Sequence, residues 1–350
     1  MAARKGVVVR WSRRGWLLGA ASCTLAPALA VRAQPAATPV EIHVQGLDRL
    51  PHLPLVLAER LGFFQEAGLR VTLTPVPEGL RTLEALAQWP AVVFAGSFER
   101  ALYMHAIGRP HQAFVLMSRS PQMVLGTSAI HMPAGQGVAD LVGAQIGIQG
   151  SGTVSERVAQ WVLMRAGLKP TDVQFVELRD ATQAMAALNS GTVEALCYGD
   201  PAVTRLELAG VLRVLADTRT LRGTEQLFGG PVACACLSAS QAFIEAHPQV
   251  VQGLASAVVR SLVWLRTAGP SDLMRHVPEA YMHGDRSLFL EIFLRSRESL
   301  AVDGLMPEAA ALNVMKALDR LRLPIDWQGV QPGNTYTNRF AMRARQQWRA

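Results

Sequence analysis

The order of apolar and polar positions divides residues 40–206 into two similar segments. Alternation predicts strands, and apolar positions at 3–4-residue spacing predict helices. The first segment predicts a strand at 40–45, a helical stretch that ends near Gly68, a strand at 70–74, a helix at 79–88 and a strand at 91–95. The second predicts a strand at 145–149, a helix at 153–166, a strand at 173–178, a helix at 181–189 and a strand at 193–198.

Short sequence marks recur at matching places in the two segments. A Gln-Gly pair follows the first strand of each, Ala-Gly-Leu closes each first helix, and a glycine ends each third strand. Gly68 and Gly167 suit helix C-terminal caps, where left-handed backbone is needed. Each β-α-β-α-β unit requires parallel strands with helices on the sheet faces. We therefore predict an α/β protein with two lobes, each a mostly parallel sheet flanked by helices; one large sheet is the alternative.

Strand-like runs at 112–117 and 122–127 flank Arg119-Ser120-Pro121, where we expect the chain to cross first between the lobes. A second crossing is expected near Gly229-Gly230-Pro231. The resulting assignment gives residues 40–120 and 245–350 to lobe one and residues 121–244 to lobe two. Amphipathic stretches then predict extra C-terminal helices at 248–268, 285–299 and 307–321, which we expect to cover lobe one.

The first 33 residues predict an export signal. They carry six cations and no acid, an uncharged Leu- and Ala-rich stretch from Gly15 to Val31, and a small-residue exit. The run from Ser12 to Leu18 is similar to a twin-arginine signal, and a plain secretory signal is the alternative. A permanent membrane anchor is less favoured, because seventeen uncharged residues fall short of the ~20 of a typical span. We expect a periplasmic, exported protein.

Composition sets the broad class. A chain of 350 residues with 50% hydrophobic and 17% charged residues is long enough for two folded domains. The net charge of +7 suggests nucleic-acid or membrane partners, but removing the six signal-peptide cations leaves about +1. The clustered C-terminal arginines read as a solvated tail rather than a nucleic-acid patch, so we expect no nucleic-acid partner. Three cysteines outside the signal (Cys197, Cys234 and Cys236) fit buried thiols better than disulfides.

Ligands of open parallel sheets bind beyond the carboxyl ends of the strands. This rule selects candidate ligand-binding residues in both lobes: Gln45, Gly46, Gly96, Ser97, Phe98, Gln149, Ser151, Gly152, Thr153, Tyr198 and Asp200. Ser151 to Thr153 and Ser97 precede helices, whose N-terminal N–H groups favour an oxyanion, although these residues also serve as plain helix caps.

The other side chains have two readings each. Asp200 precedes Pro201 and suits either an acceptor for a ligand amine or hydroxyl, or a helix cap. Tyr198 and Phe98 suit stacking on a ring or places in the core. Arg100 and Arg119 are candidates for neutralising an anion, although an exposed surface position is the default expectation for arginine.

No catalytic constellation accompanies these residues. The sequence around Ser97 lacks the nucleophile-elbow pattern, Gly150-Ser-Gly-Thr lacks the lysine of a phosphate loop, and the eight histidines have no metal-ligand spacing. We expect no catalytic residues, no metal and no cofactor.

Four motifs in order resemble the periplasmic substrate-binding proteins of ABC importers in the nitrate/sulfonate/taurine (SsuA-like) and thiamine-precursor group. They lie at residues 58–71, 140–152, 186–195 (followed by Asp200-Pro201) and 242–251. The family's usual Gly-x-x-Asp before the third strand is replaced here by Gln88-Trp89-Pro90-Ala91. The resemblance implies a type II periplasmic-binding-protein fold that closes on a hinge around its ligand.

The implied function is capture of a small organic ligand or oxyanion and delivery to an ABC permease in the inner membrane, by a protein expected to be a monomer. Two alternatives stay open. One is a periplasmic enzyme related to thiamine-pyrimidine synthases, whose Cys-rich motif is missing from this sequence. The other is a receptor subunit that reports ligand to a sensor kinase.

Overall fold

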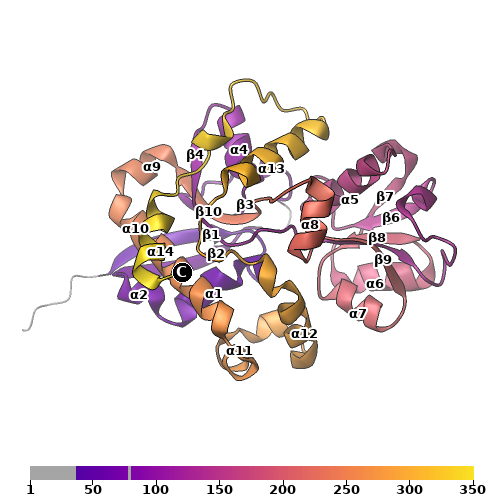
Figure 1. Cartoon of the computed structure of the whole chain (residues 1–350), viewed down its shortest axis with the longest axis horizontal. Helices are drawn as coiled ribbons and strands as arrows, with labels where there is room; N and C mark the ends of the chain where they lie inside the picture. The colour runs from indigo at the N-terminus through magenta and orange to yellow at the C-terminus, as the bar shows by residue number, and fades with distance from the viewer. Residues whose placement is uncertain (1–36, 78–79) are drawn as a thin grey trace, which may run out of the picture. The chain divides into compact units, whose positions relative to one another are not determined.

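The computed structural model describes residues 37–77 and 80–350, drawn in colour in Figure 1. The predicted export signal at 1–33 lies outside the described residues. Within them, no helix combines the length and the apolar character that a membrane span requires.

Ten strands form two sheets of five. The first sheet has the order β2-β1-β3-β10-β4. Its strands are β1 (Thr38–Val44), β2 (Leu69–Pro75), β3 (Val93–Ser97), β4 (His111–Leu116) and β10 (Ala235–Ser240). Strand β10 is antiparallel to both of its neighbours, and β1 is parallel to β2 and β3.

The second sheet repeats this plan with the order β7-β6-β8-β5-β9. Its strands are β5 (Val124–Ser128), β6 (Gln145–Ile148), β7 (Gln174–Glu177), β8 (Ala195–Tyr198) and β9 (Leu212–Asp217). Strand β5 takes the antiparallel place that β10 has in the first sheet. Each lobe is therefore a mostly parallel sheet, as predicted, and the two-lobed type II fold is confirmed.

The first sheet and the helices that pack with it are the first lobe; the second sheet and its helices are the second lobe (Figure 1). The second lobe holds α5 (Val154–Arg165), α6 (Ala181–Ser190), α7 (Ala202–Leu208) and α8 (Leu221–Phe228). The other helices are α1 (Leu53–Arg60), α2 (Phe63–Glu66), α3 (Leu83–Gln88), α4 (Glu99–Ala106), α9 (Gln241–Ala246), α10 (Pro248–Thr267), α11 (Pro270–His276), α12 (Arg286–Ser296), α13 (Glu308–Arg320) and α14 (Arg339–Trp348).

Alternation along the strands builds the cores on both sides of each sheet. In the second lobe, Cys197 packs with α5 on one face while its neighbour Leu196 packs with α6 and α7 on the other. The large first-lobe core takes in α10, α12 and much of α13, but Ala317 of α13 belongs to the second lobe's cluster. The C-terminal helices thus reach beyond the first lobe, which sequence did not predict.

Three sequence predictions need correction. Strand β10 lies in the first sheet, so assigning residues up to 244 to lobe two was wrong for 235–240, whose apolar residues fill the first core. The first helical stretch is broken into α1 and α2 at Gly62, which has a left-handed φ of 75°. Helix α3 begins after Thr82, whose side chain caps it, and not at residue 79.

Candidate functional site

A cleft of about 1230 Å³ lies between the two sheets and is lined by residues of both lobes. Small-molecule sites in proteins commonly measure ~300–1,000 Å³, so the cleft has room for such a ligand. Seven of the eleven candidate residues line it: Gln45, Gly46, Ser97, Gln149, Thr153, Tyr198 and Asp200. The remaining candidates, Gly96, Phe98, Ser151 and Gly152, are not on its walls.

Strand register explains why these residues share the cleft. In the first sheet Val44 pairs with Ala95, so Gln45 and Ser97 leave parallel strands at the same edge. In the second sheet Gly147 pairs with Leu196, which brings Gln149 and Tyr198 to one edge as well. Both edges are carboxyl ends of parallel strands, where the sequence placed the ligand.

The first lobe's edge is polar. The Ser97 hydroxyl donates to Glu99 Oε2 at 3.1 Å, and the Glu99 backbone N–H donates back to Ser97 Oγ at 3.3 Å. Ser97 therefore does cap the start of α4, as the alternative reading held. Phe98 is a correction: it is fully buried in the first core, and its N–H donates to the Cys234 carbonyl. Neither its ring nor its amide faces a ligand.

His52 lies just before α1, where the sequence allowed it to reach the cleft but favoured a surface position. It lines the cleft, is 5% exposed, and is hydrogen-bonded through Nδ1 to the Gly46 carbonyl at 3.0 Å. Because a carbonyl accepts, Nδ1 carries the proton. Burial lowers the pKa of His52 to about 4, so the ring is neutral at pH 7. The sequence signal for this position was a histidine directly before an apolar helix. The burial of that histidine depends on tertiary packing, which the sequence does not show.

The second lobe's edge was predicted to bind an oxyanion through the start of α5. Thr153 caps this helix by accepting from the Glu156 N–H at 3.4 Å. The amides before it are already taken: Ser151 N–H donates to Glu177 Oε1 at 2.9 Å and Gly152 N–H to Glu156 Oε2 at 2.6 Å. The chain's own carboxylates thus occupy these two donors. The hydrogen bonds from Ser151 lower the pKa of Glu177, as expected for a bound carboxylate.

Three contacts join the lobes across the cleft. Arg157 of α5 forms an ion pair with Glu99 of α4, and its Nη1 also donates to the Gly152 carbonyl at 2.5 Å. Arg49 Nη1 donates to Gln149 Oε1 at 3.2 Å. Arg81 donates to the Gln149 carbonyl. The loop after β6 is therefore held by two first-lobe arginines, one on the Gln149 side chain and one on its backbone carbonyl.

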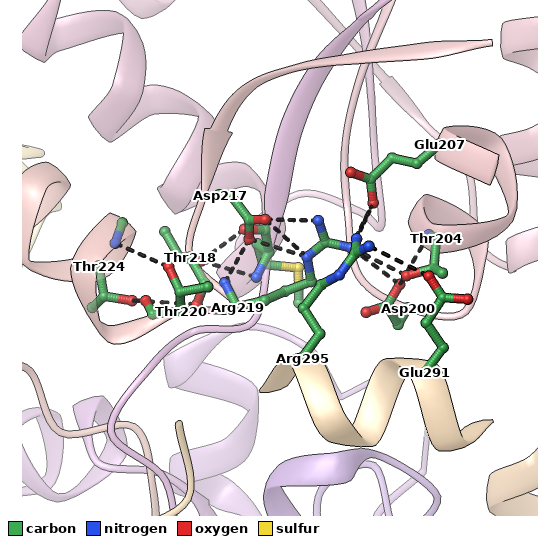
Figure 2. A network of polar contacts seen from close by, with 12 residues as sticks. Asp200, Thr204, Glu207, Asp217, Thr218, Arg219, Thr220, Thr224, Glu291 and Arg295 are labelled. Carbon is green, nitrogen blue, oxygen red and sulfur yellow. Dashed lines mark hydrogen bonds and ion pairs between the residues drawn. The ribbon is translucent and has the colours of Figure 1, made fainter. Parts of the chain in front are cut away.

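Asp200 lies on the cleft wall at the end of β8, next to the buried Arg219 (Figure 2). Its Oδ1 accepts from the Thr204 N–H at 3.0 Å and the Thr204 hydroxyl at 2.7 Å, and lies 3.7 Å from Arg219 Nη1. Asp200 thus acts as a cap for α7. Burial raises the pKa of Asp200, and the guanidinium of Arg219 opposes that rise.

Tyr198 and the two candidate arginines have structural roles. The Tyr198 hydroxyl donates to the Leu178 carbonyl at 2.8 Å, and burial raises its pKa to about 12. Arg119 donates to the carbonyls of Leu300 and Glu298, where the chain crosses between lobes. Arg100 is buried beneath the Phe94 ring, with its guanidinium 4.3 Å from the ring centroid. Neither arginine lines the cleft, so the prediction that they neutralise an anion there was wrong.

The three cysteines among the described residues are free thiols: Cys197 and Cys236 are buried, and Cys234 is half-buried on the cleft wall. Burial raises the pKa of Cys234 well above its usual value, which disfavours a thiolate. Within residues 37–77 and 80–350, no cluster of three or more His, Cys, Asp or Glu side chains is arranged to hold a metal ion.

The fold and the cleft define a two-lobed protein of the type II periplasmic-binding-protein class. The family model described as NMT1/THI5 like matches residues 50–268, and the chain belongs to this family. A solved protein of Bordetella bronchiseptica RB50 is 35% identical, with a TM-score of 0.80 over 89% of this chain and 98% of its own.

Two more distant solved structures have the same fold. The alkanesulfonate-binding protein SsuA from Xanthomonas axonopodis pv. citri, bound to MOPS, is 20% identical, with a TM-score of 0.64 over 87% of this chain and 99% of its own. The desulfurization enzyme DSZB is 17% identical, with a TM-score of 0.60 over 89% and 99%. The fold therefore carries both binding proteins and an enzyme.

Proposed function

We propose that this chain is an exported solute-binding protein that captures a small organic ligand or oxyanion between its lobes. It would deliver that ligand to an ABC permease in the inner membrane. The observation that carries the proposal is the cleft of about 1230 Å³, walled by the carboxyl ends of parallel strands from two sheets. A ligand held there contacts both lobes, so binding favours their closed arrangement over an open one.

The domain plan supports a hinge. The chain passes between sheets after β4 and again before β10, and each lobe keeps its own core. Two such crossings allow rigid lobes to close around a ligand. The cross-lobe contacts of Arg49, Arg81 and Arg157 would form on closure and break on opening.

Binding is favoured over catalysis by the chemistry of the cleft wall. Cys234 is a candidate nucleophile on the cleft wall, and its raised pKa keeps it a thiol. His52 Nδ1 donates to the Gly46 carbonyl and Nε2 has no partner among the described residues, so no hydrogen bond links this ring to Cys234. An enzyme on this scaffold, as in DSZB, remains the second candidate because the folds match. Turnover of a bound compound by the purified protein would favour it.

The ligand classes to test follow from relatives and from the cleft. SsuA of Xanthomonas binds MOPS, and the amides of Ser151 and Gly152 are filled from within, so sulfonates and neutral polar compounds deserve equal places in a screen. The first experiment is native mass spectrometry of the purified protein, to identify any small molecule that co-purifies. The second is thermal unfolding with sulfonates, nitrate, aminopyrimidines, aromatic acids and neutral polar compounds.

A true ligand stabilises the native state by about 2.7 kcal/mol at a concentration of 100 times Kd. Gln149→Ala should weaken this stabilisation, because Gln149 lines the cleft and holds Arg49 across it. Gln346→Ala, on the exposed face of α14, is the matched control and should behave as wild type. Absence of any co-purifying molecule together with no stabilisation across the screen would overturn the proposal.

A further inference from the structure

Asp200 lies on the cleft wall at the end of β8, and only one of its two carboxylate oxygens accepts hydrogen bonds from the described part of the chain. All contacts that Asp200 makes with the described residues go to Oδ1, from Thr204 and Arg219. Oδ2 receives no hydrogen bond from the part of the chain that the structure describes. The side chain is 14% exposed and lines the cleft. An ionised carboxylate has acceptor capacity on both oxygens, so Oδ2 is open to a donor in the cleft.

Arg219 fixes the direction of that carboxylate. It is 1% exposed and is itself held by Asp217, through Nε at 3.0 Å and Nη2 at 2.7 Å, and by Glu207 Oε2 at 2.7 Å. Its Nη1 also donates to the Thr204 hydroxyl at 3.1 Å, which in turn donates to Asp200. Figure 2 shows Arg219 enclosed by these groups, with Asp200 and Thr204 at one end of the guanidinium.

The network carries excess negative charge. Its acids are Asp200, Glu207, Glu291 and Asp217, and its cations are Arg219 and Arg295. Four carboxylates against two guanidinium groups leave a formal charge of −2. Of these groups only Asp200 lines the cleft, and Arg49 and Arg81 line it from the first lobe. The negative excess is therefore local to the end of β8, where it favours a cation over an anion.

We propose that Asp200 Oδ2 accepts a hydrogen bond from a protonated amine of the ligand, and that Arg219 with Thr204 is the pair of positioning residues that aims this oxygen. The inference rests on the proposed binding function and narrows its ligand to compounds with an ammonium group. A neutral hydroxyl could also donate to a carboxylate, but the formal charge of −2 favours the cation.

The test uses matched probes that differ in one substituent. Taurine, isethionate and ethanesulfonate carry an ammonium, a hydroxyl and neither, on the same two-carbon sulfonate. Benzenesulfonate and 4-(aminomethyl)benzenesulfonate give the same contrast on a larger body. Titration calorimetry and thermal unfolding with the purified full protein measure each Kd. We expect the amine-bearing probe of a set to bind about 10- to 100-fold more tightly, as charge-assisted hydrogen bonds of ~1.5–3 kcal/mol imply.

Variants locate the effect. Asp200→Asn should remove the amine preference while changing Kd for the probe without an amine less than about threefold. Thr204→Val should reduce the preference, because it removes one of the bonds to Oδ1. Thr224→Val is its matched control: Thr224 is equally buried and bonded to Thr218 and Thr220, but has no contact with Asp200. It should keep the full preference.

Each outcome of these measurements supports or overturns the assignment of Asp200 Oδ2 to a ligand ammonium group. A preference for the hydroxyl probe, an equal affinity for all members of a set, or an amine preference that survives Asp200→Asn overturns the assignment. If no probe binds, the ammonium class is rejected. The binding function is judged separately, by the molecule that co-purifies and by the wider ligand screen, so it can stand when this inference falls.

Discussion

Each lobe buries one arginine almost completely, and the two have opposite surroundings. Arg219 of the second lobe and Arg100 of the first are both 1% exposed. Arg219 contacts three carboxylates. Arg100 Nε donates to the Leu86 carbonyl at 3.1 Å, and the Phe94 ring lies against the guanidinium. The Nη1 atom of Arg100 has no hydrogen-bond partner, and no ion pair joins Arg100 to any described residue.

The difference shows what a buried guanidinium group does in each lobe. Burial without a counter-charge lowers the pKa of Arg100 to about 10, a sign that its cation is held at a cost. Arg219 instead organises the end of β8, where Asp200 meets the cleft. The same β-α-β-α-β pattern therefore frames two different cleft edges. In the second lobe a buried ionic network holds Asp200, whereas in the first lobe Arg49, Arg81 and Glu99 make their contacts across the cleft.

Replacing the two arginines should give the largest contrast. Arg219→Met leaves Asp200, Asp217 and Glu207 without their common partner, and breaking a buried pair in this way costs about 3–5 kcal/mol. Arg100→Met removes an unpaired buried cation and keeps its apolar stem, so we expect little change or a gain. Urea unfolding measures both. Equal losses in the two variants would contradict the comparison.

The first lobe's edge should instead respond to pH through His52. Its pKa is about 4 in the native state against 6.5 unfolded, so the unfolded chain takes up a proton first as pH falls. The stabilisation from neutral His52 is complete above pH 6.5 and declines between 6.5 and about 4, by roughly 3 kcal/mol at 1.36 kcal/mol per unit.

His52→Asn should flatten this decline, because its amide can still donate to the Gly46 carbonyl but does not titrate. His111, whose pKa burial also lowers to about 4, should leave part of the slope in place. Unfolding free energies at pH 7, 6 and 5 measure it, with His283→Asn on the exposed surface as control. An unchanged pH slope in His52→Asn would show that the ring is not held neutral.

A third contrast compares two threonine helix caps, one in each lobe. Thr153 caps α5 in the second lobe and Thr82 caps α3 in the first. Thr153 also donates to the Gly150 carbonyl at 2.6 Å, so it fixes the loop as well as the helix. We expect Thr153→Ala to cost about 1–2 kcal/mol and Thr82→Ala about half of that. Thermal unfolding tests the order, which a larger loss in Thr82→Ala would reverse.

Sequence predicted the backbone well because its signals are local. Periodicity and the repeated Gln-Gly and Ala-Gly-Leu marks gave the strand ends that meet at the cleft, including Gln45, Ser97 and Gln149. The return of β10 to the first sheet was beyond those signals, since pairing of distant strands leaves no periodic trace. The chemistry of the edges depends on side chains brought from elsewhere: Glu177 to Ser151, Arg219 to Asp200, and the packing that buries His52 and Phe98.

The smallest expected effect concerns the loop that sequence assigned to an oxyanion. Glu177 accepts from the Ser151 N–H, and its lowered pKa means that this contact stabilises the fold above the ordinary carboxyl pKa and is lost as pH falls through the native value. Glu177→Gln should therefore cost a few tenths of a kcal/mol at pH 7, because the exposed contact is screened by water, and less as pH falls through the native pKa.

The same variant bears on the ligand. If the Ser151 N–H is a ligand donor that Glu177 covers only in the empty protein, Glu177→Gln should tighten binding of sulfonates, because the competing carboxylate loses its charge. If the carboxylate belongs to the bound state as well, sulfonate affinity should stay the same. Asp180→Asn, at the exposed N-cap of α6 on the same side of the cleft, controls for the change in net charge. We expect unchanged affinity, because Glu177 and Glu156 satisfy these two amides without a ligand.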